Sequence, residues 1–399
     1  MTRRTNNYAK RGVESGKQSV HKAVAALYKG VYPNAFCKIY QHPVLASYCR
    51  TLHADTAGSK PSLAWLVYIL TGDIELATQV ALDSAFMNVD DVGCIGAVDD
   101  LILNQTIGFN SHVVPAALYQ RLIVRTEELC QLLRKWGIGI RFAGGETASV
   151  GNIVRTFDVG NSLYAELKHK DVIDAGNMGP GDILIGISST GQASWETVKN
   201  SGMGSNGLTS SIHDMLRPYY RRYKEACAPQ LVRKGMAFRG KHWIDDLLPS
   251  DHTFTVGQAL LSATRTYMPL IKLVLEHVGR KHITGIIHCS GGGQSKIMKF
   301  GKPGNLYLID QPFPVPPLFR DIQRDSQTSW EEMYEVFNMG WRLIFATKDK
   351  GAGAEIIQIS EKSNIDADRV GKIIPLEGSG PNAVKVISAY GELDLGKEK

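Results

Sequence analysis

The clearest pattern in the sequence is a helix over residues 116–136. Its apolar positions fall on one face, and Gly137 follows them as a stop signal. These positions are Leu118, Leu122, Leu129, Leu132, Leu133 and Trp136. A second helix is expected from Pro269 to Gly279, because proline favours the first turn and glycine the end. Short apolar segments at 182–188, 284–288 and 342–347 predict strands. Alternating helices and strands indicate a mixed α/β fold.

The length of the chain predicts two domains. Its 399 residues exceed the size at which one hydrophobic core usually stops growing. Residues 168–181 are polar and rich in turn formers, as expected of a connection between domains. We therefore predict an N-terminal domain over residues 1–175 and a C-terminal domain over residues 176–399.

Composition narrows the class of protein. The 45 Lys and Arg residues exceed the 39 Asp and Glu residues by only six, a balance that suits anionic small molecules but not nucleic acid. No apolar stretch is long enough for a membrane helix, and no apolar run follows the basic N-terminus. We expect a soluble cytoplasmic protein without a membrane partner. The six cysteines form no Cys-x-x-Cys pair, which argues against a zinc or redox site.

Residues 53–60 combine an acid, a glycine and a lysine after an extended segment, residues 48–52, that we interpret as a strand. The Asp55 carboxylate suits a hard divalent cation, Gly58 lets the backbone approach an oxyanion, and Lys60 supplies a point charge for phosphate. The stretch predicts a loop that holds a metal-bound phosphate. A solvated surface turn is the alternative if the stretch is taken alone.

Further carboxylates extend this hypothesis. Residues 76–94 have a helical pattern that places Asp83 and Asp91 on one face. Together with Asp55 and Glu146, Asp91 forms a candidate set for Mg²⁺ carried in with ATP, since magnesium takes few protein carboxylates plus waters. Helix caps or surface charges are the alternative for each acid.

Three glycine-rich segments add candidate ligand loops. Gly144 and Gly145 follow a predicted strand, where the backbone is expected to turn sharply beside a ligand. Residues 202–207 match Gly-x-Gly-x-x-Gly, but their position argues against a dinucleotide fold. They are better interpreted as the start of a helix whose free amides bind phosphate. The run 288–293 places His288 before three glycines, either as a general acid or base or as a core histidine.

The order of these segments resembles one enzyme family. The motifs are Met87-Asn-Val-Asp-Asp91, Gly144-Gly-Glu-Thr-Ala148, Gly204-Ser-Asn-Gly207, Ala263-Thr-Arg-Thr-Tyr267, His288-Cys-Ser-Gly-Gly-Gly293 and Glu332-Met-Tyr-Glu-Val-Phe-Asn338. From about residue 8 to residue 386 the chain resembles the phosphoribosylformylglycinamidine cyclo-ligases, and most of all the branch found in Bacteroides-like bacteria. The resemblance implies two α/β domains, N-terminal domains that pair in a homodimer, and ATP with Mg²⁺. It also implies ATP-driven closure of formylglycinamidine ribonucleotide to aminoimidazole ribonucleotide in purine biosynthesis.

Motifs and resemblance together give the candidate site. The expected groups that act on the reaction are Lys60, Asp91 and His288, and the expected metal ligands are Asp55, Asp91 and Glu146. Expected to bind ATP are Asp55, Gly58, Lys60, Asp91, Gly144, Gly145, Glu146 and Thr147. Expected to bind the substrate or its phosphate are Ser205, Asn206, Gly207, Thr264, Arg265, Ser290, Gly291, Gly292, Gly293 and Asn338.

Two positions depart from the family pattern. Where the family has Pro-His-Ser-Asn-Gly, this chain has glycine at position 204, and Asp90 precedes Asp91 in place of asparagine. We expect His288, or else His213 on an exposed helix face, to take over the duty of the missing histidine. Two other functions stay open: another ATP-dependent enzyme of the superfamily, such as a selenophosphate synthetase or small-molecule kinase, and a nucleotide-binding regulator without turnover.

Overall fold

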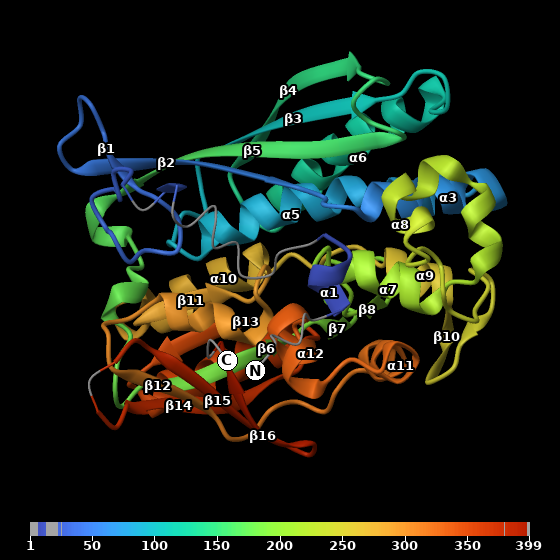
Figure 1. Ribbon diagram of the computed structural model, residues 1–399. Helices are drawn as coiled ribbons and strands as arrows, with labels where there is room; N and C mark the ends of the chain where they lie inside the picture. Colours follow the sequence, from blue (N-terminus) through green and yellow to red (C-terminus); the bar gives the residue numbers. More distant parts are fainter. Residues whose placement is uncertain (1–6, 13–22, 25, 379, 397–399) are drawn as a thin grey trace.

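Two β-sheets, each with its own helices, form the two halves of the molecule (Figure 1). The computed structural model describes residues 7–12, 23–24, 26–378 and 380–396. The first sheet has the order β1-β2-β5-β3-β4, with β3 and β4 parallel. Its strands are β1 (Tyr40–Gln41), β2 (Tyr48–Thr56), β3 (Leu101–Phe109), β4 (Ile140–Ser149) and β5 (Phe157–Lys168).

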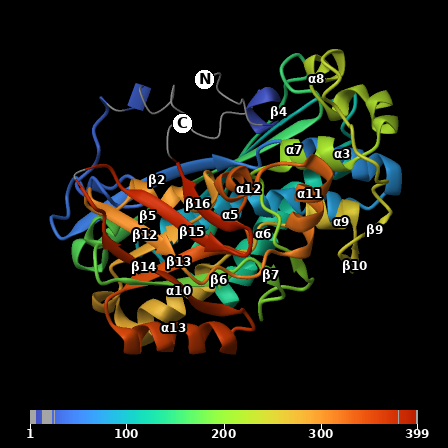
Figure 2. The same ribbon diagram turned by 60° about the horizontal axis from the view of Figure 1, so that its bottom comes forward.

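The second sheet has seven strands in the order β11-β13-β6-β14-β12-β15-β16. They are β6 (Ile183–Ser188), β11 (Gly285–His288), β12 (Asn305–Ile309), β13 (Trp341–Thr347), β14 (Ala367–Pro375), β15 (Ala383–Ser388) and β16 (Gly391–Leu395). Helix α13 (Lys350–Lys362) packs beneath this sheet (Figure 2). The predicted domain boundary at residue 175 lies between the last strand of the first sheet and the first strand of the second.

Helices α5 (Val80–Gly93) and α10 (Met268–Val274) lie between the two sheets, and further helices of both halves lie beside them (Figure 1). Besides α5, the first half contributes α3 (Lys60–Thr71), α4 (Ile74–Thr78) and α6 (Ala116–Lys135). Besides α10, the second contributes α7 (Leu208–Met215), α8 (Pro229–Arg233), α9 (Val256–Leu261), α11 (Pro317–Ser326) and α12 (Trp330–Val336). Short elements are α1 (Asn7–Lys10), β7 (Thr190–Gly191), β8 (Asn200–Ser201), β9 (Leu247–Leu248) and β10 (Asp251–Thr255). Helix α10 contacts α5, so the halves meet along these two helices (Figure 1).

The mixed α/β fold and its most periodic elements are confirmed. Helix α6 covers the predicted residues with Leu118, Leu122 and Leu133 buried, and α10 continues as a π turn to Gly279. The strands predicted at 182–188, 284–288 and 342–347 are β6, β11 and β13. The helix predicted over 76–94 is divided at Gln79 into α4 and α5. None of the described helices is long and apolar enough to cross a membrane.

The prediction of a sharp turn at Gly144 and Gly145 is wrong, because both residues lie within strand β4. Its register against β3 shifts between Leu103 and Gln105, which is a β-bulge. A Cβ atom on Gly145 would overlap the carbonyl oxygen of Gln105, and both glycines have positive φ, +77° and +159°. The glycines are therefore required by the bulge itself.

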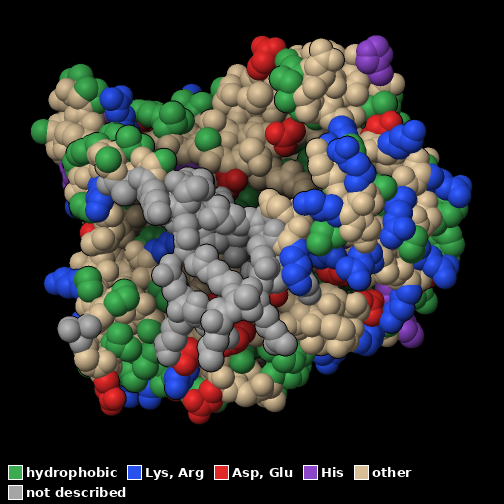
Figure 3. All heavy atoms as spheres, in the orientation of Figure 1, with side chains coloured by type: hydrophobic (Ala, Val, Ile, Leu, Met, Phe, Trp, Pro, Cys, Tyr) green, Lys and Arg blue, Asp and Glu red, His purple; other side chains and the backbone are tan. Residues whose placement is uncertain are grey.

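Positive charge is concentrated in one segment of the second half, residues 217–241. This basic segment holds eight of the 45 Lys and Arg residues and one of the 39 Asp and Glu residues, so it carries +7 and the rest of the chain −1. Most of its Lys and Arg side chains are exposed. Figure 3 shows them gathered on the side of the molecule where α8 lies.

We predict that Gly145→Ala destabilises the protein by about 3 kcal/mol or more, since the new methyl group meets backbone that cannot move aside. Urea unfolding of the protein without any ligand measures this. Gly179→Ala is the matched control, because Gly179 has an ordinary φ and open space around its Cβ position. Equal stability of the two variants would contradict the structural role of Gly145.

Candidate active site

A cavity of about 560 Å³ lies between the two halves, and we call it the cleft. The first half lines it with Asp55, Thr56, Gly58, Ser59 and Met87. The second half lines it with Ser205, Asn206, Thr209, Ser290, Gly291, Gly292, Lys296, Lys299, Glu335 and Val336, and Tyr8 of α1 completes it. Of the predicted site residues, the structure brings together Asp55, Gly58, Ser205, Asn206, Ser290, Gly291 and Gly292.

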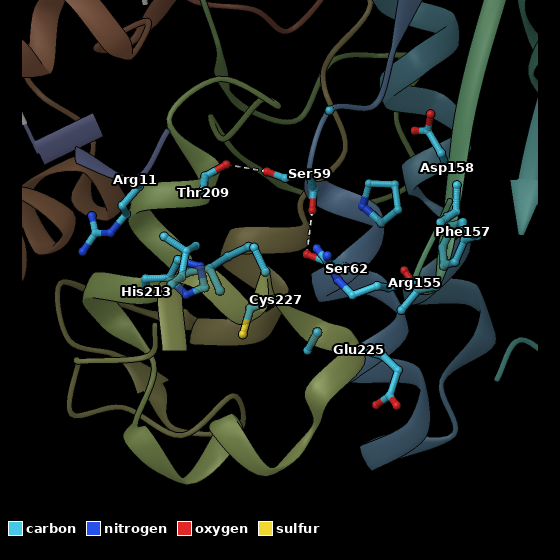
Figure 4. Close-up of a pocket in the computed structure, with 18 of the residues that line it drawn as sticks. Arg11, Ser59, Ser62, Arg155, Phe157, Asp158, Thr209, His213, Glu225 and Cys227 are labelled. Carbon is cyan, nitrogen blue, oxygen red and sulfur yellow. Dashed lines mark hydrogen bonds between the residues drawn. The ribbon is translucent and has the colours of Figure 1, made fainter. Parts of the chain in front are cut away.

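A second cavity of about 470 Å³ adjoins the cleft and shares Thr56, Gly58, Ser59 and Thr209 with it. Between the two cavities the hydroxyl groups of Ser59 and Thr209 are 2.7 Å apart. Figure 4 shows His213 and Cys227 on one side of the second cavity and Arg155, Phe157 and Asp158 on the other. The arrangement offers adjoining spaces for two ligands.

The backbone around Gly58 explains why both cavities reach this point. Strand β2 runs to Thr56, so His53 and Asp55 lie in the strand and not in a loop as the sequence predicted. The turn is short, with Gly58 at φ +63°, and α3 begins directly at Lys60. Alternation along β2 turns His53 and Asp55 toward the same face of the sheet, where α5 packs.

Lys60 does not face the cleft. Its side chain is fully buried, and its Nζ lies 2.8 Å from Oδ1 of Asp83 and 2.5 Å from the carbonyl oxygen of Ser262. Burial lowers the pKa of Lys60, which Asp83 opposes. Asp83 Oδ1 also accepts from the backbone N–H and the hydroxyl of Thr264, at 2.9 and 2.6 Å. In this structure Lys60 therefore joins α3, α5 and the segment before α10.

Two cations line the cleft, Lys296 and Lys299, and neither was among the residues predicted from the sequence. Lys296 is the less exposed of the two. Its Nζ lies 3.2 Å from Ser290 Oγ and 4.5 Å from the ring centre of Phe36. Burial raises the pKa of Asp55, and Lys296 is among the groups that oppose this rise. The signal in the sequence was its position: Lys296 follows Gly293 by three residues, in the 3₁₀ turn that the glycine run opens.

Asp91 and His288 form a buried pair between the halves. His288 Nδ1 lies 2.7 Å from Asp91 Oδ1, and His53 Nε2 lies 3.4 Å from Asp91 Oδ2. Burial raises the pKa of Asp91, but Lys296, His288 and His53 together bring it down to about 2. His288 is fully buried, and burial lowers its pKa. Neither residue lines the cleft, and His53 is a second missed member of this network.

Asp90 makes a third contact between the halves. Its Oδ1 accepts from Thr266 Oγ1 at 2.7 Å and from the backbone N–H of Tyr267 at 2.9 Å. Burial raises the pKa of Asp90 to about 8, with Asp91 adding to the rise. Burial therefore favours the neutral carboxylic acid form of Asp90.

The three expected metal ligands do not meet within one chain. Glu146 is exposed on β4, which pairs with β3 at Thr106, whereas Asp55 lies on β2, three strands away. Thr147 lies beside Glu146 on the same strand. Within the described ranges no three His, Cys, Asp or Glu side chains gather around a possible metal position.

The remaining predicted residues support the cleft from behind. Arg265 is buried, with a two-pronged contact to Glu196 and bonds to the carbonyls of Ser188 and Thr190. Asn338 donates to the Gly202 carbonyl at 2.9 Å. A Cβ on Gly207 would overlap the ring of Phe337, and one on Gly293 would overlap the carbonyl of Tyr334. These residues fix the loops that carry Ser205, Asn206 and Ser290.

The expectation that His213 is exposed is wrong. His213 is buried on α7 and packs edge-on against Phe238, with ring centres 4.9 Å apart. Burial lowers its pKa to about 3, so the ring is neutral. The backbone N–H of Phe238 donates to its Nδ1 at 3.3 Å. His213 contributes a neutral wall to the second cavity.

Solved structures share the fold. The chain is similar to the protein in the crystal structure of a HypE–HypF complex, with a TM-score of 0.57, 14% identity and coverage of 95% of this chain and 99% of that one. It is also similar to phosphoribosylformylglycinamidine synthase II from Thermotoga maritima, with a TM-score of 0.56, 12% identity and coverage of 98% and 50%. A third match is AaThiL complexed with AMPPCP and TMP, with a TM-score of 0.50, 11% identity and coverage of 94% and 94%. The chain thus has the two-part α/β fold of this class of proteins.

Two proteins with similar sequences carry the same enzyme name. A phosphoribosylformylglycinamidine cyclo-ligase of Methanococcus maripaludis is 29% identical over 337 residues, covering 82% of this chain and 78% of the relative. One of Methanocaldococcus jannaschii is 28% identical over 361 residues, covering 86% and 84%. No protein-family model matches the chain. The resemblance is confirmed: the chain is a homologue of enzymes named phosphoribosylformylglycinamidine cyclo-ligase.

Lys60→Met should destabilise the protein by about 3–5 kcal/mol, because it leaves the Asp83 carboxylate buried without a partner cation. Denaturant unfolding measures this, with exposed Lys302→Met as the control. Adding Asp83→Leu should restore part of the loss. A Lys60→Met protein of normal stability that has lost turnover would instead show a direct phosphate contact.

The pKa of Asp90 predicts a pH-dependent stability. Folding raises it from about 3.9 to about 8, so the folded state holds an extra proton between these values and the free energy of unfolding falls as pH rises through this window. In Asp90→Asn this slope should be absent. Urea unfolding at pH 5, 6, 7 and 8 tests it against exposed Asp366→Asn, and equal slopes in all three proteins would refute the assignment.

Proposed function

We propose that the protein is a phosphoribosylformylglycinamidine cyclo-ligase that uses ATP to close formylglycinamidine ribonucleotide to aminoimidazole ribonucleotide. The observation that carries the proposal is the pair of adjoining cavities at Gly58, because a reaction between two anionic substrates needs two spaces that meet. The names of the curated relatives support the same reaction. Purine biosynthesis is the process proposed for it.

The chemistry of the lining suits phosphate groups in the cleft. Lys296 and Lys299 lie there with the hydroxyls of Ser205 and Ser290 and the backbone of Gly291 and Gly292. Glycine lets the backbone approach an oxyanion, and an ammonium group offsets its charge. Helix α7 begins at Leu208, directly after the loop of Ser205 and Asn206, so its first turn is a candidate for binding phosphate. ATP binding is further supported by AaThiL, which was solved with AMPPCP.

Mg²⁺ is proposed to enter with the ATP phosphates. Magnesium is usually held by one or two carboxylates together with phosphate oxygens and waters. Asp55 lines the cleft with a carboxylate and fits this donor set, and Glu335 is a second carboxylate at the rim. When bound, the ion would neutralise charge on the transferring phosphoryl group.

The proposed reaction moves one phosphoryl group. The γ-phosphorus leaves ADP and bonds to the formyl oxygen, which makes the formyl carbon electrophilic. The neighbouring amidine nitrogen then bonds to this carbon, loses a proton, and the carbon–oxygen bond breaks with release of phosphate. The task of the protein is to hold both reactants and to offset charge, through Lys296 and the loops at Ser205 and Ser290.

A homodimer that pairs through the first sheet is part of the proposal. Leu52, Tyr164 and Ile102 are register partners on β2, β5 and β3, so they form one row across the outer face. Leu52 is 65% exposed and Ile102 45%. An exposed apolar row on an open sheet is typical of a surface that pairs with a second copy. Six buried, unpaired cysteines support the proposed cytoplasmic location.

The function is tested by mixing the protein with ATP, Mg²⁺ and formylglycinamidine ribonucleotide. ADP, phosphate and aminoimidazole ribonucleotide should appear in equal amounts, and only when all three are present. ADP without the cyclised product would indicate a kinase of the superfamily. Nucleotide binding without any turnover would indicate a regulator.

Lys296→Met should lower turnover by about two orders of magnitude, the scale expected when one donor to the transition state is lost. Lys296 is only half-buried, so the variant should keep its stability. Lys302→Met, outside the cleft, is the control. Unchanged turnover in Lys296→Met would remove Lys296 from the proposed mechanism.

A further inference from the structure

Gly204 lies in the loop before α7, and its backbone does not require glycine. Its φ lies outside the left-handed region that other glycines of the chain occupy, so a side chain is allowed there by conformation. The obstacle is another residue. A Cβ on Gly204 would lie 2.9 Å from Nη2 of Arg342 and 3.3 Å from its Cζ. The Arg342 guanidinium therefore occupies the space that a side chain at position 204 would need.

A β-bulge directs Arg342 to this place. The register of β13 against β6 shifts between Trp341 and Leu343, so Arg342 is the extra residue. Bulges change the direction in which a side chain points, and they occur often beside functional sites. The backbone at Arg342 is fixed by a 2.5 Å bond from the Cys289 N–H to its carbonyl oxygen. Its Nη2 donates to the Gly202 carbonyl at 2.9 Å.

The Arg342 charge is buried with few partners. The side chain is 2% exposed, and burial lowers the pKa of its guanidinium, although the negative charge of Asp83 partly offsets this. In the part of the chain that the structure describes, no carboxylate lies within ion-pair distance of Arg342, and its Nη1 has no hydrogen-bond partner. The buried hydroxyl of Ser205, which lines the cleft, is also without a partner.

A buried guanidinium without a carboxylate partner is expected to serve a function. Burying an unpaired charge is costly, and an anion at the neighbouring surface would offset that cost. Gly204 separates the guanidinium from Ser205 and Asn206, two residues of the cleft wall. The two histidines expected to act for the missing one, His213 and His288, are both buried in other contacts.

We infer that Arg342 replaces, in both space and charge, the histidine that the family pattern has at position 204. Arg342 is a positioning residue: it supports the loop of Ser205 and Asn206 from behind and adds positive charge for a phosphate group bound in the cleft. Its effect on turnover rests on the proposed function, whereas its effects on stability and on phosphate binding do not.

A reciprocal exchange tests the inference. Gly204→His should lower the melting temperature and abolish tight ADP binding, because the ring meets the guanidinium. Arg342→Ala should weaken ADP binding about tenfold or more, the scale of a lost charge-assisted contact. The double variant Gly204→His/Arg342→Ala should bind ADP at least about tenfold more tightly than Gly204→His and melt at a higher temperature. Calorimetry at low salt and thermal melting provide these readouts.

If Arg342→Ala does not fold, the more conservative substitutions Gly204→Ala and Arg342→Lys provide the same test. Gly204→Ala should lower the melting temperature in the wild-type background but not in Arg342→Lys, whose head group is smaller. The changes in ADP affinity or melting temperature caused by substitution at position 204 and at position 342 are compared with the change in the double variant. If the two single effects add up to the double effect, the residues do not share one space and the inference fails. Normal ADP binding by Arg342→Ala would refute the role in phosphate binding. Coupling without any cyclisation would leave the inference intact and reject the proposed function alone.

Discussion

Helix α5 holds the two halves of the molecule together through three buried carboxylates. Asp83 binds Thr264, Asp90 binds Thr266 and Tyr267, and Asp91 binds His288, all in the second half. The cleft is bounded by these same halves, so its width depends on where α5 lies. Together with the contacts of α3 to the second half, this helix helps to hold the loops at Ser205 and Ser290 opposite Gly58.

The free-energy cost of removing each carboxylate from water is offset in a different way. Asp83 is paired with a fully buried lysine, Asp91 lies between two histidines, and burial raises the pKa of Asp90 to about 8, which favours its neutral form. Replacing such groups by apolar ones often costs little stability, so their value is better sought in specificity. Hydrogen bonds depend on direction, so three such contacts on α5 fix both the rotation of the helix about its axis and its position along that axis. Apolar packing alone defines these two quantities less precisely.

Local periodicity in the sequence was sufficient to predict several helices and strands, although the helix predicted over 76–94 is divided at Gln79. Helix α6, helix α10 and the strands β6, β11 and β13 follow from apolar spacing, and the structure places the predicted residues Gly58 and Ser290 in the lining of the cleft. The sequence was insufficient where a residue's role depends on a distant partner. Lys60 meets Asp83, and His288 meets Asp91 197 positions away, so both point into the interior. For the same reason Lys296 and Lys299, not Lys60, supply the positive charge of the cleft.

Because of the basic segment, net charge is distributed unevenly over the molecule. Its residues include the stretch from Glu225 to Leu231 that walls the second cavity, while the remainder of the chain has almost no net charge. The protein is thus a dipole whose positive end includes one wall of the second cavity. At an ionic strength where fields decay over about 8–10 Å, an anionic ligand that approached this side would be attracted before any contact formed. Salt would slow the encounter while leaving the buried contacts between the halves untouched.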